Sequence, residues 1–175
     1  MEYNMNFETE IAKYLKNKSL FSKTLISDIP KVNGIYIIGI DEDNIKFSEN
    51  STAIPNYKGK NLLYKKYDLE YKFNKCKNKI LYIGKAEAKE GGLKERITQL
   101  ARYSQGKCNN HRGGKALWQI KEWEKYLYLY WCETQNAHVA ETKLLQLFSS
   151  EHPYIDNVKP YDKVKYSYPL ANWRK

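Results

Sequence analysis

Two short stretches decide the fold of this chain: residues 32–40 read VNGIYIIGI, and residues 79–84 read KILYIG. Both are rich in isoleucine and aromatic residues, so each predicts a short buried strand. Each stretch also carries a tyrosine two positions from a glycine, Tyr36 after Gly34 and Tyr82 before Gly84. Because glycine lets another group come close to the backbone, the paired tyrosines indicate a functional site as well as a core.

The length and charge of the chain limit the classes of protein it can belong to. Its 175 residues suit a single domain, residues 1–175, with its own core. The formal net charge of +10 predicts a polyanionic partner, nucleic acid before any other. No apolar run of about 18 residues occurs, so no membrane segment is expected. Three scattered cysteines and no signal-peptide core predict a cytoplasmic protein.

Residues 41–79 separate the two strands and have a different composition, polar and lysine-rich with several tyrosines. We interpret them as an insertion between the strands. The insertion has two alternative interpretations. Its lysines and tyrosines form a phosphate-binding surface with stacking side chains, or it is a solvated, partly ordered loop.

The rest of the chain predicts four helices and a third strand. The helices cover residues 6–18, 93–103, 115–123 and 137–148, and the strand covers residues 126–132. Asn6 or Thr9 is the expected cap of the first helix, and Asn136 is the expected cap of the last. The segment from Pro153 onward is expected to wrap irregularly over the core.

The paired tripeptides resemble the signature of the GIY-YIG nuclease superfamily. Two later segments extend this resemblance: residues 93–97, LKERI, match the family pattern L-x-x-R-[IV], and residues 141–145, ETKLL, match E-x-x-L-[IL]. The loop before residue 93 is longer than in simpler members. The resemblance covers about residues 30–172. It implies an α/β fold with a small central three-stranded antiparallel sheet flanked by helices, and an insertion between the first two motif strands.

The resemblance also implies hydrolysis of DNA phosphodiester bonds with one Mg²⁺ or Mn²⁺ ion per active site. Tyr36 would be the base or would position the water, with Tyr82 as its hydrogen-bonding partner. A tyrosine, with a pKa of about 10, acts as a base only if its surroundings lower that value or if it works through water. Arg96 would bind the scissile phosphate, and Glu141 would hold the metal.

Arg96 and Glu141 each have an alternative interpretation. Arg96 flanks the apolar face of its expected helix, where its stem could simply cover the core. Glu141 falls within an apolar stripe, where a carboxylate is costly unless it is paired or bound to a metal. An ion pair with Arg96, or a favourable position near a helix N-terminus, is the alternative to metal binding.

Two family positions are not settled by the sequence. The family places an asparagine after the last helix, and both Asn157 and Asn172 fit. Many members carry a His or Tyr one turn after the arginine, where this chain has Leu100. Tyr103 or His111 is the candidate that would supply the missing group.

Residues 91–121 hold seven Lys or Arg and one acid, so they form the best candidate DNA-binding surface. The residues predicted to contact DNA are Lys85, Tyr103, Lys107, His111, Arg112, Lys115, Asn157 and Asn172.

A stand-alone chain of this kind most resembles a restriction-type endonuclease acting on double-stranded DNA, as a homodimer if both strands are to be cut. A homing, mobile-element or repair nuclease is the alternative within the superfamily. A non-catalytic nucleic-acid-binding domain of the same fold is the alternative outside enzymes.

Overall fold

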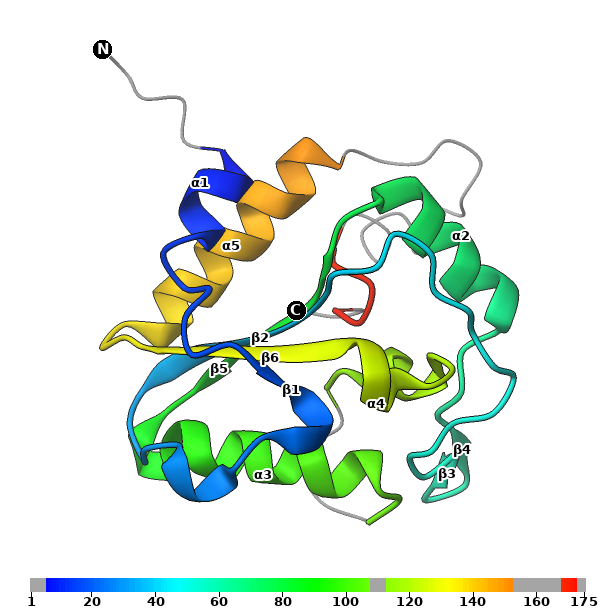
Figure 1. Ribbon diagram of the computed structural model, residues 1–175, viewed down its shortest axis with the longest axis horizontal. Helices are drawn as coiled ribbons and strands as arrows, with labels where there is room; N and C mark the ends of the chain where they lie inside the picture. The colour runs from blue at the N-terminus through cyan, green and yellow to red at the C-terminus, as the bar shows by residue number, and fades with distance from the viewer. Residues whose placement is uncertain (1–5, 108–112, 153–167, 173–175) are drawn as a thin grey trace.

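A computed structural model describes residues 6–107, 113–152 and 168–172 (Figure 1). Its centre is a four-stranded antiparallel sheet with the strand order β1-β6-β2-β5. The strands are β1 (Ser19–Leu20), β2 (Gly34–Ile40), β5 (Ile80–Ala86) and β6 (Leu127–Glu133). The helices are α1 (Phe7–Ile11), α2 (Lys66–Cys76), α3 (Gly92–Ser104), α4 (Trp123–Tyr126) and α5 (Ala137–Glu151), with short 3-10 helices η1 (Phe21–Lys23), η2 (Ile26–Asp28), η3 (Ala88–Glu90) and η4 (Lys115–Gln119).

The expectation of three strands was wrong, because β1 adds a fourth at the edge of β6. A two-residue strand is too short to show the alternation by which strands are recognised in a sequence. The first helix ends at Ile11, earlier than expected, which frees the following residues to reach the sheet. Asn6 is its cap, since the Asn6 Oδ1 accepts the Thr9 N–H at 2.8 Å.

The central strand β2 is buried along its whole length, with a different layer on each side. One face of the sheet carries Tyr36, Ile38 and Tyr82, which pack in a core cluster with α3 and the insertion. The other face carries aliphatic residues such as Ile35 and Ile37, which pack against α1 and α5. Figure 1 shows α3 on one side of the sheet and α1 with α5 on the other.

The predicted helices at 93–103 and 137–148 are confirmed as α3 and α5. Leu93, Ile97 and Leu100 are all buried, as the spacing on α3 indicates. The single short helix expected at 115–123 is instead two pieces, η4 and α4.

The insertion is a folded part of the molecule and not a solvated loop. It contains α2 and the small hairpin of β3 (Asn56–Tyr57) and β4 (Lys60–Asn61). Phe47, Leu69 and Phe73 from this segment are buried in the core cluster. The buried side chain of Gln119 anchors it, because its Oε1 accepts the Tyr64 N–H at 2.8 Å and its Nε2 donates to the Tyr64 carbonyl at 2.9 Å.

Candidate active site

The two motif tyrosines lie next to each other on the same face of the sheet. Their ring centroids are 5.9 Å apart with a 50° angle between the ring planes. Tyr36 pairs with Gly84 across β2 and β5, and the Tyr36 ring lies over that glycine. A Cβ on Gly84 would fall 2.5 Å from the Tyr36 Oη, so only glycine leaves room for the ring. The Tyr36 side chain thereby extends across β5, toward the outer edge of the sheet.

Gly34 allows a different close contact, between α3 and β2. A Cβ at this position would fall 2.5 Å from Leu93 Cδ1 and 2.6 Å from the Cys132 carbonyl oxygen. The absence of a side chain therefore lets the first turn of α3 pack directly onto β2. Arg96 follows Leu93 by three residues, about one helical turn, so this close packing sets where the arginine lies.

The start of α3 is fixed by backbone hydrogen bonds. The Leu93 N–H donates to the Val32 carbonyl at 3.0 Å, and the Lys94 N–H donates to the Pro30 carbonyl at 3.1 Å. Amides in the first turn of a helix have no partner within the helix, and these two find one in the segment that leads into β2. The strand with Tyr36 and the helix with Arg96 are thus joined at their starting points.

Arg96 is half-buried and its guanidinium is held in place by its own helix. Nη1 donates to Gln99 Oε1 at 2.9 Å, and Gln99 Nε2 donates to Glu95 Oε1 at 2.9 Å. The positive charge lowers the pKa of both Tyr36 and Tyr82 relative to what burial alone would give.

Burial and neighbouring charges shift the pKa of both tyrosine hydroxyls. Burial raises the pKa of Tyr36, while the Arg96 charge and a hydrogen bond with Tyr82 oppose that rise. Burial raises the pKa of Tyr82 well above its usual range, and the neighbouring Tyr36 raises it further. Both pKa values are thus raised above the usual tyrosine range, so both hydroxyls are neutral at pH 7. This state favours a hydroxyl that positions water over a phenolate that acts as a free base.

Glu141 completes the group from the opposite side of the sheet. It is half-buried on α5, the helix that packs against β5. Its negative charge raises the pKa of both tyrosines, so the carboxylate is close enough to act on their hydroxyls. The structure thus brings together Tyr36, Tyr82, Arg96 and Glu141, which come from β2, β5, α3 and α5.

The donor set at this site fits one hard divalent cation. Mg²⁺ binds through one or two carboxylates and completes its shell with waters and phosphate oxygens. Glu141 supplies such a carboxylate, and the cationic Arg96 can take a phosphate. Among the residues that the structure describes, no three His, Cys, Asp or Glu side chains gather in one place. A metal held by one carboxylate would take the rest of its ligands from water and substrate.

Of the two candidate asparagines, Asn172 lies beside the second tripeptide, and Asn157 lies outside the described residues. Asn172 is buried, its Nδ2 donates to the Ile83 carbonyl at 2.8 Å, and its Oδ1 accepts the Ile83 N–H at 2.9 Å. The side chain therefore attaches residues 168–172 to the strand next to Tyr82. A DNA contact by Asn172 would require both of these bonds to break.

Lys85 follows Gly84 and forms a polar cluster that the sequence did not reveal. Its Nζ lies 3.0 Å from Glu87 Oε1 and 3.2 Å from His138 Nδ1. His138 precedes Glu141 by three residues on α5, so both lie on the same side of that helix. That spacing is the signal in the sequence that points to His138.

The other residues predicted to contact DNA are dispersed. Tyr103 is only 3% exposed, in the same core cluster as Tyr36 and Tyr82, so a DNA contact would require it to leave the core. Lys107 is exposed after the end of α3, and Lys115 is half-buried with its Nζ 5.8 Å from the Tyr64 ring centroid. His111 and Arg112 lie outside the described residues.

Compared with known proteins, the chain matches no family model, no curated protein and no solved structure. None of the helices in the described parts of the chain combines the length and apolar character that a bilayer-spanning segment needs. Any assignment of function therefore rests on the geometry and charges of the site itself.

Proposed function

We propose that this protein is a metal-dependent endonuclease of the GIY-YIG kind, which hydrolyses phosphodiester bonds in double-stranded DNA as a restriction-type enzyme. One observation carries the proposal: Tyr36, Tyr82, Arg96 and Glu141 act on one another electrostatically although they come from separate elements. A purely structural core would have no use for two buried hydroxyls, a guanidinium and a carboxylate in one place.

Each of the four side chains has a defined part in this reaction. The neutral Tyr36 hydroxyl, hydrogen-bonded to Tyr82, orients the attacking water. The Arg96 guanidinium binds the scissile phosphate and stabilises the charge that develops on its oxygens. Glu141 would hold the Mg²⁺ or Mn²⁺ ion. When bound, this ion polarises the phosphate and makes a coordinated water more acidic.

The charge of the molecule supports DNA as the partner, since a net charge of +10 favours a polyanion. Cutting both strands would require a second active site, which a homodimer supplies. A cytoplasmic location belongs to the same proposal. A homing, mobile-element or repair nuclease would use the same four residues, whereas a non-catalytic DNA-binding domain would not need them.

The proposal is tested by incubating plasmid DNA with the protein and Mg²⁺, with a chelator as the blank. Glu141→Gln keeps the shape of the side chain but removes its charge, so we expect cleavage to be abolished while DNA binding is retained. Glu124→Gln, at an exposed position on α4, is the matched control and should cut normally. Wild-type-like cleavage by Glu141→Gln would refute the metal assignment. A wild-type protein that binds DNA but does not cut it with Mg²⁺ or Mn²⁺ would favour the non-catalytic domain.

A further inference from the structure

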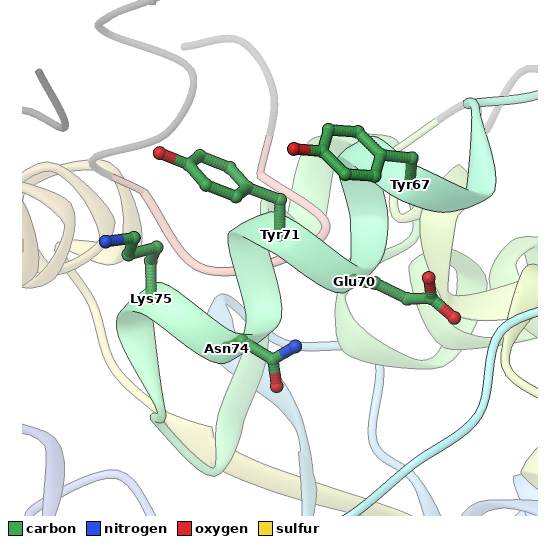
Figure 2. A pocket seen from close by; sticks show the side chains of 5 residues that line it. All are labelled: Tyr67, Glu70, Tyr71, Asn74 and Lys75. Carbon is green, nitrogen blue, oxygen red and sulfur yellow. The ribbon is translucent and has the colours of Figure 1, made fainter. Parts of the chain in front are cut away.

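Helix α2 of the insertion carries a line of side chains that the proposed active site does not use. Tyr67, Tyr71 and Lys75 are spaced four residues apart, so they lie in one row along the helix. Figure 2 shows the three side chains extending to the same side of α2. We call this row the α2 stripe. Its span of eight residues corresponds to about 12 Å along the helix axis.

The stripe presents aromatic surface beside a positive charge. Tyr67 is 72% exposed, although large aromatic side chains are usually buried. The Tyr67 and Tyr71 rings are nearly parallel, with centroids 6.1 Å apart and 16° between their planes. Lys75 Nζ lies 5.7 Å from the Tyr71 ring centroid. Together with Glu70 and Asn74, these residues line an open hollow on the surface (Figure 2).

The opposite side of α2 holds the stripe in a fixed position. Leu69 and Phe73 are buried in the core cluster. The fully buried Lys72 donates from its Nζ to the Asn172 carbonyl at 3.4 Å, and the Asn172 side chain is bonded to Ile83. Lys72 and Asn172 thereby link α2 to β5, the strand that carries Tyr82.

A flat aromatic surface next to a cation matches the chemistry of a nucleotide. A base stacks on the ring face, and the lysine takes the phosphate. In a duplex the faces of the bases are covered by their neighbours, so only an unpaired base can stack on the protein. The charge around the stripe also suits a DNA strand, because the lysines on and beside α2 outnumber its two acids, Asp68 and Glu70. These lysines are Lys65, Lys66, Lys75 and Lys77.

We propose that the α2 stripe binds unpaired bases of a DNA strand, so that the substrate is a duplex with a single-stranded segment beside it. At about 3.4 Å per stacked base, a 12 Å stripe accommodates about three or four bases. The substrate class rests on the proposed nuclease function, whereas the binding of unpaired bases does not.

The test measures binding in the presence of a chelator, so that no cleavage occurs. Fluorescence anisotropy compares a blunt duplex with the same duplex carrying a short single-stranded overhang. We expect the wild-type protein to bind the overhang substrate more tightly. Tyr67→Ala should weaken that binding by about 5- to 100-fold, the range for loss of one stacked base, and leave the affinity for the blunt duplex unchanged. Tyr67→Phe keeps the ring and should bind like the wild type.

Three results would overturn the proposal. One is unchanged overhang binding by Tyr67→Ala, and another is an equal loss on blunt and overhang DNA, which would indicate a backbone contact only. The third is a loss with Tyr67→Phe as large as with Tyr67→Ala, because stacking does not need the hydroxyl. Because Tyr67 is exposed, each variant is expected to fold, and a thermal melt checks this. A protein that passes this test but cuts no DNA would fail as a nuclease and still bind unpaired bases.

Discussion

The two faces of the central sheet are built on the same strands but bury different chemistry. The aliphatic face, with Ile35 and Ile37 against α1 and α5, is packed by hydrocarbon. The tyrosine face, with Tyr36 and Tyr82 against α3, buries two hydroxyls whose pKa values are raised. Buried polar groups are costly unless they are bonded, so the tyrosine face needs partners that the aliphatic face does not. We infer that the aliphatic face stabilises the fold and that the tyrosine face carries the chemistry, together with Glu141 from α5.

The largest expected effect is on stability and comes from the aliphatic face. Phe7 is completely buried and packs edge-to-face on Phe148, with ring centroids 5.0 Å apart. Phe7→Ala should lower the free energy of unfolding by about 3–5 kcal/mol. Denaturant titration measures this change, with Phe7→Leu as a milder control. The cleavage rate per folded molecule should stay the same, and a slower rate would break the proposed division between the faces.

The next largest effect is expected on the cleavage rate, from substitutions at the tyrosine face. Tyr36→Phe removes one hydroxyl and keeps the ring, so we expect cleavage to slow by about 10²-fold or more with little change in melting temperature. Arg96→Lys keeps the charge but loses the planar fork, so it should also be slow. Single-turnover kinetics and thermal melts on the same samples separate the two roles. A lower melting temperature with a normal rate for Tyr36→Phe would make its role structural and leave Tyr82 as the candidate base.

An intermediate effect on both properties is expected at Gly84. The new methyl group of Gly84→Ala would collide with the Tyr36 ring, so we expect a loss of about 1–3 kcal/mol in stability and a slower reaction. Tyr36→Leu shortens the opposing side chain and should remove most of the stability loss, which a double-mutant cycle measures. If Gly84→Ala is equally destabilising in both backgrounds, the tyrosine ring is not the cause.

The smallest effect is a pH dependence from Lys72, on the helix that covers part of the tyrosine face. Burial lowers the pKa of Lys72 to about 7, against about 10.4 in the unfolded chain. Between these values the unfolded state binds more protons, so stability should rise with pH, by at most about 1.4 kcal/mol per pH unit. Urea titrations at pH 7 and 8.5 should show a steeper rise for the wild type than for Lys72→Met. If stability rises equally with pH in the wild type and in Lys72→Met, the lowered pKa of Lys72 is contradicted.

Patterns within short stretches of the sequence were sufficient to predict part of this structure. The strands β2, β5 and β6 and the helices α3 and α5 follow from local periodicity, and the spacing of the tripeptides pointed to Tyr36, Tyr82 and Arg96. Features that depend on contacts between residues far apart in the sequence could not be predicted from it. The insertion folds because scattered residues such as Phe47 meet a core supplied by other segments, and a lysine-rich sequence hides them. The placement of Asn172 depends on a bond to Ile83, a residue 89 positions away, which no local pattern predicts.

That bond has a consequence for the behaviour of the molecule in solution. β5 is the last strand of its sheet, and an unpaired strand edge is a template on which another chain can add itself. The Asn172 carboxamide occupies both backbone groups of Ile83, and the Ala171 N–H occupies the Leu81 carbonyl at 2.8 Å. Ala171 and Asn172 thus bond to the edge of β5 as a neighbouring strand would. The edge of the strand that carries Tyr82 is thereby protected, at Leu81 and Ile83, against the addition of another strand.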